Sequence, residues 1–400
     1  MTSRLRPPPL PVAVAASVAL AVTGLSVAPA LAAPAPPSVA RHHHGIPAEQ
    51  ARALAGALAD LPADDATAAL VRVGGREGAW RGSAGVHDLD SRRPALPGAR
   101  FRAGSATKVL TAAVVLQLAD EGRVALNRPA RSYLPDLIPA RYRHVTVRQL
   151  LNHTSGIPAA ETTADTLEEA YAHRFDRTTP RAAVASATAR DPEFRPGTVQ
   201  HYLNINYTVL GLLVERVTRH SYEEEVNRRV IRPLGLRDTY LPGADPAIRG
   251  PHNHGYQMFP TADGGTEPRD VTVWGQTGSW AAGDLVSTTA DLERLMTALF
   301  RGRVVRGPAL EEMFTLPGGR VRMYGSDDPA AYSAGLSMLR LGGREVWAKT
   351  GSRYGYLTGV AATRDLSRTL VYSVNDTDAK GSGMSDRVLA LAGAAFGAAG

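Results

Sequence analysis

Segments with strand character lie toward both ends of this 400-residue chain, and the stretch between them has helical character. Near the first end, residues 67–73 and 79–86 flank a Gly-Gly turn. Near the other end, strands are predicted over 332–341, 346–350, 356–363 and 369–375. Strands this far apart in the sequence close most simply into one mostly antiparallel sheet. The sequence therefore predicts an α+β fold, with a sheet from both chain ends flanked by helices and an inserted, mostly helical lobe.

The same pattern sets the expected boundaries. Residues 46–400 are predicted to form one domain. Its α/β lobe would consist of about 46–123 and 278–400, and its helical lobe of about 124–277. Residues 33–45, rich in Ala and Pro and containing His42, His43 and His44, are predicted to be a linker.

Residues 1–32 have the layout of a secretory signal peptide. Arg4 and Arg6 precede an apolar stretch over 10–28, and Ala30-Leu31-Ala32 provides a small-x-small cleavage site. Pro and Gly interrupt the apolar stretch, which favours cleavage over retention as a membrane anchor. No later segment approaches the roughly 20 apolar residues that a transmembrane helix needs. We therefore expect a secreted, extracellular protein without a transmembrane anchor after cleavage, and association with the cell wall stays open.

Composition excludes some functions and marks three residues. The net charge of +7 comes from scattered Arg residues rather than a basic run, so we expect no nucleic-acid partner. The absence of Cys excludes disulfides and thiolate metal sites. Among the 45 Lys and Arg residues, only Lys108, Lys349 and Lys380 are Lys. Lys can lose its proton when it is buried among other cations and Arg cannot, so each Lys of this chain deserves inspection.

Ser105-Ala106-Thr107-Lys108 lies at the start of a strongly apolar helix predicted over 105–121. Residues at i and i+3 share a helix face, so the Ser hydroxyl and the Lys amine can meet. The helix N-terminus would favour an oxyanion and lower the pKa of the Lys, as nucleophilic catalysis requires. The alternative, that Ser105 is only an N-cap and Lys108 a surface residue, is about equally compatible with this motif alone.

Two further motifs are weak individually. Tyr202-Leu203-Asn204 precedes an apolar helix predicted over 207–219, where a loop could face a cleft. Lys349-Thr350-Gly351 lies at the end of a predicted strand, where a cation and a hydroxyl could hold a carboxylate and a Gly would let backbones approach. Either segment could equally be a packed Tyr or a plain strand end.

Taken together, the three motifs resemble those of the penicillin-recognising serine enzymes, in order, separation and structural context. Residues 101–108, 150–157, 196–211 and 349–356 look like the segments that surround the family's motifs, and the resemblance covers roughly 46–376. It is closest to the serine D-alanyl-D-alanine carboxypeptidases and class C β-lactamases. Leu203 is bulkier than the Ser or Ala usual at that position, and Lys349 matches class C β-lactamases, whereas many carboxypeptidases have His there. The resemblance implies a β-lactamase/transpeptidase-like fold.

The resemblance also implies catalytic roles. Ser105 would attack a carbonyl and form an acyl-enzyme, and Lys108 and Tyr202 would share the role of general base. The backbone N–H groups of Ser105 and Ser352 would form an oxyanion hole. His153 could suggest a triad with Ser155, but a structural role is the preferred interpretation.

Substrate-binding roles follow from the same resemblance. Asn204 would hold Lys108 and a substrate amide. Lys349 would tune Tyr202, and together with Thr350 it would receive the substrate carboxylate. Gly351 and Ser352 complete the predicted substrate-binding segment.

The expected substrate is a peptide ending in D-Ala-D-Ala or a β-lactam, and the preferred activity is D-alanyl-D-alanine carboxypeptidase. A class C-type β-lactamase, an esterase or D-amino-acid peptidase, and a non-catalytic penicillin sensor are the alternatives. No cofactor and no metal are implied, and the sequence leaves the oligomeric state open.

Overall fold

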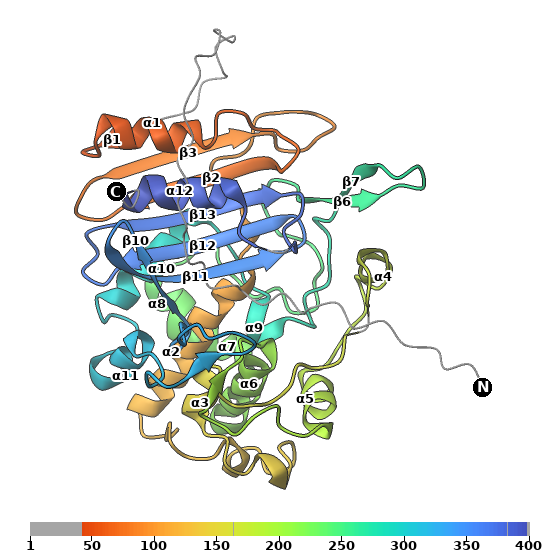
Figure 1. Cartoon of the computed structure of the whole chain (residues 1–400), viewed down its shortest axis with the longest axis vertical. Helices are drawn as coiled ribbons and strands as arrows, with labels where there is room; N and C mark the ends of the chain where they lie inside the picture. The colour runs from red at the N-terminus through yellow and green to blue at the C-terminus, as the bar shows by residue number, and fades with distance from the viewer. Residues whose placement is uncertain (1–41, 163, 382, 398–400) are drawn as a thin grey trace.

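The fold is centred on a seven-stranded sheet in which neighbouring strands run antiparallel (Figure 1). The computed structural model describes residues 42–397 except 163 and 382. The strand order is β1-β3-β2-β13-β12-β11-β10, so the two chain ends meet where β2 pairs with β13. The strands are β1 (His42–His44), β2 (Ala66–Gly74), β3 (Ala79–Gly85), β10 (Ser337–Leu341), β11 (Arg344–Arg353), β12 (Tyr356–Thr363) and β13 (Thr369–Asp376). The predicted sheet from both chain ends is confirmed.

Helices cover both faces of this sheet (Figure 1). On one face, α1 (Ala48–Gly56) and α12 (Asp386–Phe396) belong to a core that includes Leu370, Tyr372 and Val374 of β13. On the other face, α10 (Thr289–Phe300) contacts β13, whose Val371 belongs to the second core. Successive strand residues point to opposite faces, so a strand covered on both sides buries all its side chains. Every residue of β13 is buried.

Two segments differ from the sequence prediction. His42–His44, predicted to lie in the linker over 33–45, instead form β1, which pairs with β3. Backbone pairing at a sheet edge requires no particular side chains, so the His tract gave no strand signal. The strand predicted over 332–341 begins only at Ser337, because a turn with Gly335 at a φ of 82° separates it from Tyr332.

The inserted, mostly helical lobe of the predicted fold is present. Its helices are α3 (Val147–Leu151), α4 (Leu167–Ala172), α5 (Pro180–Ala189), α6 (Asn204–Thr218), α7 (Tyr222–Val226) and α8 (Arg232–Leu234), with 3₁₀ turns at Ala130–Ser132 and Ala140–Tyr142 and a π-helical turn at Asn227–Ile231. A hairpin of β6 (Tyr256–Pro260) and β7 (Thr266–Asp270) follows. Next along the chain come α9 (Trp280–Gly283), α10, α11 (Gly307–Glu311) and a 3₁₀ turn at Glu312–Phe314.

Helix α2 (Thr107–Asp120) joins the lobe to the sheet. It is buried on nearly all sides and contacts α6, α9 and α11, as its uniformly apolar sequence predicts. The 3₁₀ turn η1 (Gly104–Ala106) precedes α2 and lies beside β11. Short pairings between β4 (Phe101–Arg102) and β8 (Val286–Ser287), and between β5 (Val199–Gln200) and β9 (Arg322–Met323), connect distant segments. Ser105, which lies in η1 just before α2, is therefore beside β11, the strand that contains Lys349.

The predicted signal peptide, residues 1–32, lies outside the described residues, as does the linker as far as residue 41. Within the part of the chain that the structure describes, none of the helices combines the length and the apolar character needed to cross a bilayer.

Candidate active site

Ser105 and Lys108 meet at the junction between η1 and α2. Lys108 Nζ lies 3.2 Å from Ser105 Oγ, as the i, i+3 spacing predicted. Ser105 is the middle residue of η1, and the N-cap of α2 is Ala106, which makes no side-chain capping bond. The alternative that Ser105 serves as the N-cap is therefore wrong. Ser105 is partly exposed, whereas Lys108 is fully buried.

Three oxygens surround the Lys108 amine. Besides Ser105 Oγ, it contacts Asn204 Oδ1 at 2.7 Å and the carbonyl oxygen of Ala282, in α9, at 2.7 Å. Burial lowers the pKa of Lys108 well below its ordinary value, and the charges of Lys349 and Lys380 lower it further. A neutral amine has two N–H donors and one lone pair. The two carbonyl oxygens can take the donors, which leaves the lone pair for the Ser105 hydroxyl proton.

Tyr202 has a buried hydroxyl, although the residue as a whole is only partly buried. Two amines lie close to the ring, with Lys108 Nζ 5.0 Å and Lys349 Nζ 4.8 Å from its centroid. Its hydroxyl faces the side chain of Ser105. Burial raises the pKa of Tyr202 well above its ordinary value, and the facing Ser105 hydroxyl opposes this effect. This phenol holds its proton more tightly than a free Tyr does.

The sequence predicted that Asn204 lies in a loop before the helix, but Asn204 is the first residue of α6. The helix starts here because Leu203 is extended, at φ −133° and ψ 142°, and is buried beneath the segment. This start leaves Asn204 exposed, with its Oδ1 directed at Lys108 Nζ.

Lys349-Thr350-Gly351 lies inside β11 rather than at its end. The neighbouring strand β10 pairs with β11 only from Arg344 to Ala348, so the edge of β11 is open to η1 beyond that point. Lys349 is 3% exposed, and its Nζ donates to the carbonyl oxygen of Thr350 at 2.8 Å. Burial lowers the pKa of Lys349 to about 7. Thr350 is exposed on this edge.

Two glycines allow η1 and β11 to approach closely. A Cβ at Gly351 would clash with the carbonyl oxygen of Ala103 and lie 2.9 Å from Ser105 N. A Cβ at Gly104, where φ is +51°, would lie 2.7 Å from Ser352 N and 3.0 Å from Ser352 O. Ala or any larger residue cannot occupy these positions without a backbone shift. The backbone N–H groups of Ser105 and Ser352 thus lie on facing segments beside the Ser105 hydroxyl.

A comparison with protein families shows which family has this arrangement of motifs. The family model described as Beta-lactamase matches residues 54–395. The chain belongs to the beta-lactamase family. It is therefore a serine hydrolase of the group that includes the penicillin-binding proteins, and the predicted β-lactamase/transpeptidase-like fold is confirmed.

The alignments with two curated relatives each cover about half of this beta-lactamase family chain. Protein flp of Staphylococcus aureus (strain MW2) is 27% identical over 213 residues, which is 52% of this chain and 40% of the relative. Penicillin-binding protein 4 of Amycolatopsis lactamdurans is 33% identical over 200 residues, which is 48% of this chain and 49% of the relative. The matches thus span less than half of each relative's length.

Solved structures cover more of this family member. A D-stereospecific amidohydrolase from Streptomyces sp. is 31% identical, with a TM-score of 0.75, and the match covers 87% of this chain and 98% of that one. D-amino acid amidase from Ochrobactrum anthropi SV3, complexed with L-phenylalanine amide, is 24% identical, with a TM-score of 0.71 over 86% of this chain and 98% of that one. The second match supports the shared fold alone.

Sequence reasoning missed two residues that hold Tyr202 in place in this beta-lactamase family member. The ring of Tyr332 lies 4.7 Å from that of Tyr202. Gln200, fully buried, fixes the Tyr332 backbone, since its amide donates to Tyr332 O at 2.8 Å and accepts from Tyr332 N at 2.9 Å. The segment containing Tyr332 had been assigned to a strand, and a lone Gln has no sequence pattern that marks such a role.

His153 supports the same Tyr and forms no triad. Its ring lies 4.5 Å from the Tyr202 ring, and its Nδ1 accepts from Leu203 N at 3.4 Å. Ser155 instead donates to Asn206 Oδ1 at 2.6 Å. Burial lowers the pKa of His153 well below its ordinary value, with further lowering by Lys108. The structural role predicted for His153 agrees with these contacts.

Lys380, the third Lys of this family member, also lies at the site. Its Nζ donates to the carbonyl oxygen of Ser352 at 2.9 Å. No motif contains Lys380, but the scarcity of Lys in the sequence was a signal that could have found it.

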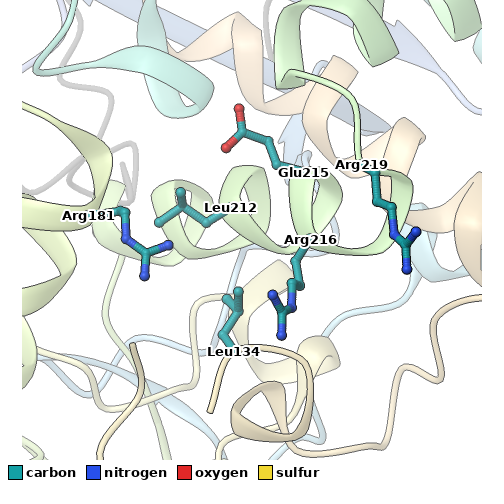
Figure 2. A pocket seen from close by; sticks show the side chains of 6 residues that line it. All are labelled: Leu134, Arg181, Leu212, Glu215, Arg216 and Arg219. Atoms are coloured by element: carbon teal, nitrogen blue, oxygen red, sulfur yellow. The ribbon is translucent and has the colours of Figure 1, made fainter. Parts of the chain in front are cut away.

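Two cavities of the described residues lie away from Ser105. One of about 540 Å³ is lined by residues that include Arg181, Arg216 and Arg219, and Figure 2 shows Arg216 projecting from α6 beside it. It shares no lining residue with the Ser105 site. Among residues 42–397, leaving out 163 and 382, no group of three or more His, Asp or Glu side chains is placed to hold a metal ion.

Proposed function

We propose that this serine hydrolase is a D-alanyl-D-alanine carboxypeptidase that forms an acyl-enzyme on Ser105. The observation that carries the proposal is the Lys108 amine, held by two carbonyl oxygens and 3.2 Å from Ser105 Oγ. It lies at an open strand edge where Thr350 is exposed and the amine of Lys349 is buried next to it. A cation and a hydroxyl on that edge suit a peptide that ends in a carboxylate.

In the proposed acylation step, the neutral Lys108 amine accepts the Ser105 hydroxyl proton while Ser105 Oγ attacks the scissile carbonyl. The N–H groups of Ser105 and Ser352 stabilise the oxyanion. The pKa of Lys108 is lowered and that of Tyr202 is raised, so Lys108 is the better base. Tyr202 fits better as a donor that gives its proton to the leaving amine and regains one from Lys108.

In deacylation, water replaces Ser105 as the nucleophile, and Lys108 again acts as the base. The D-Ala leaving group departs, and water takes its place before the acyl carbonyl. Lys108, having returned its proton through Tyr202, is again neutral and accepts a proton from the attacking water. Lys108 then gives this proton to Ser105 Oγ as the bond between Oγ and the acyl carbon breaks. Asn204 Oδ1 keeps the Lys108 amine in place during both steps, because it holds one of the N–H donors at 2.7 Å.

A second candidate is hydrolysis of D-amino acid amides. It is favoured by the 31% identity to a D-stereospecific amidohydrolase over 87% of this chain. Such a substrate has no carboxylate on its leaving group, so the Lys349–Thr350 edge would have no anion to bind. For this reason we rank the carboxypeptidase first.

The residues before 33 are proposed to direct export. A mature chain beginning at Ala33, found by N-terminal sequencing of protein from the culture medium, would support this. Recovery of the unprocessed chain from the cytoplasm would contradict it.

The activity is tested with three substrates on wild type and Ser105→Ala. The substrates are diacetyl-L-Lys-D-Ala-D-Ala, its D-Ala-L-Ala isomer and D-phenylalanine amide. We expect release of D-Ala from the first by the wild type alone, and no release from the L isomer. Cleavage of the amide without the peptide would select the amidase, and D-Ala release by Ser105→Ala would exclude Ser105 as the nucleophile.

A further inference from the structure

The cationic side chains at the open edge of β11 form two separate groups. Lys349 Nζ lies over the Tyr202 ring and donates to Thr350 O. Lys380 lies beyond Ser352, and its Nζ donates to Ser352 O at 2.9 Å. The N–H of Ser352, one of the two proposed oxyanion donors, is between these groups along the strand. A substrate whose carbonyl oxygen points at that N–H therefore extends toward Lys349 on one side and toward Lys380 on the other.

Lys380 lies in the loop after β13, and contacts with β11 and the turn after it hold it in place. Ser352 Oγ donates to the carbonyl oxygen of Ala379, the residue before Lys380. The Lys380 amine also lies 5.8 Å from the ring centroid of Tyr354, which stacks on Trp274 at 4.3 Å. The amine is thus fixed by two residues of β11 and its turn rather than free on the surface.

Lys380 and its neighbour Arg353 form a cationic pair of side chains beside Ser352. Burial lowers the pKa of Lys380 to about 7, and the charge of Arg353 contributes to this lowering. Arg353 donates to Ser279 Oγ, and its buried Nε has no partner. In the described part of the chain, neither Lys380 nor Arg353 forms an ion pair.

Among the described residues, the nearby acids form no ion pair with Lys380 or Arg353, although Asp284 raises the pKa of Arg353. Asp284 is 2% exposed, and burial raises its pKa well above the ordinary value, which favours the neutral form. In the loop of Lys380, Asp376 Oδ1 accepts from Asp378 N at 2.8 Å, and Asp378 Oδ1 accepts from Gln257 at 3.2 Å.

We infer that Lys380, together with Arg353, forms an anion subsite for the acyl portion of the substrate. This inference rests on the proposed acyl transfer to Ser105 and adds a substrate class to it. The preferred acyl donors carry a carboxylate on the side of the scissile carbonyl that faces Lys380. Donors with a free ammonium group there are disfavoured by the two cations. Lys380 is a specificity-determining residue and acts on binding rather than on the bond that breaks.

The test uses p-nitrophenyl esters of D-alanine whose amino group is succinylated, acetylated or free. Their leaving group has no carboxylate, so the test does not depend on the Lys349–Thr350 edge or on carboxypeptidase activity. In the wild type, we expect kcat/KM for the succinyl ester to exceed that for the acetyl ester about tenfold at low ionic strength, since a half-buried charge is screened less than an exposed one. The ammonium ester should be the poorest donor.

Lys380→Met should reduce the succinyl-to-acetyl ratio to near one and improve the relative rate of the ammonium ester. Lys380→Arg should keep the ratio, and Arg301→Met, which removes an exposed cation at the end of α10, is the control for net charge. An equal ratio in wild type and Lys380→Met would overturn the subsite, as would a wild type that hydrolyses none of the esters. Charge preference among the esters without D-Ala release from the peptide would reject the carboxypeptidase and leave the subsite standing.

Discussion

Lys108 Nζ lies 3.2 Å from Ser105 Oγ, and its other two hydrogen-bond partners, Asn204 Oδ1 and Ala282 O, can only accept. A protonated amine could donate to all three oxygens, but burial and the neighbouring Lys residues lower its pKa. In the neutral form, the lone pair faces the hydroxyl that must lose a proton. The geometry and the pKa shift therefore point to the same base.

Replacing Lys108 by Arg should reduce acylation by about two to four orders of magnitude. The substitution keeps a cation near Ser105 but removes the base, because Arg stays protonated. The rate of acylation by a penicillin is the measurement, with thermal unfolding as a check that the buried site still folds. Near-normal acylation would exclude Lys108 as the base.

Replacing Lys349 by Met should move the acid limb of the activity profile to higher pH. The charge of Lys349 lowers the pKa of Lys108, so its removal raises that pKa. Activity needs neutral Lys108 and is lost as pH falls through this pKa, so the loss should begin at a higher pH than in the wild type. The measurement is kcat/KM as a function of pH. The quantity compared is the pH at which kcat/KM falls to half of its maximum, and not the maximum itself. An unshifted limb would contradict the coupling, and Arg301→Met should leave it unshifted.

Asn204→Asp replaces a neutral acceptor 2.7 Å from Lys108 Nζ with a carboxylate of the same shape. A carboxylate stabilises the ammonium form, so the pKa of Lys108 should rise by about one unit or more. We expect activity at pH 7 to fall about tenfold and to recover in part at higher pH. Asn127→Asp, the same change at an exposed residue, should have no such effect. Equal profiles for the two variants would disprove the role of Asn204.

Gly351→Ala should impair both acylation and stability. The new Cβ would clash with Ala103 O and approach Ser105 N to 2.9 Å, so η1 and β11 must separate. We expect a loss of about 1–3 kcal/mol in the free energy of unfolding. Gly393→Ala is the matched control, because Gly393 lies in α12 with no atom within 4 Å of its added Cβ. This control should stabilise by about 0.5–1 kcal/mol. Urea unfolding of both variants measures the difference, and an unaltered Gly351→Ala would show that the close approach is not required.

The features that the sequence predicted correctly depend on residues close together in the chain. Alternation and turn residues placed the strand Tyr356–Thr363 at its observed bounds, and the i, i+3 spacing brought Ser105 to Lys108. Contacts between distant segments had no such pattern. The Ala282 carbonyl reaches Lys108 from 174 residues away, and Gln200 binds Tyr332 across 132 residues. Lys380 also lies outside every motif, and only its rarity as a residue type marked it.

Intact mass over time, after a penicillin is mixed with the protein, shows whether Ser105 is acylated. We expect a mass gain equal to the drug, located on Ser105 in wild type, absent in Ser105→Ala and strongly slowed in Lys108→Arg. A lasting adduct would fit the carboxypeptidase, and one that vanishes while the drug is consumed would indicate a β-lactamase. An adduct that persists in Ser105→Ala, or none in wild type from either the penicillin or the D-alanine esters, would contradict acylation of Ser105.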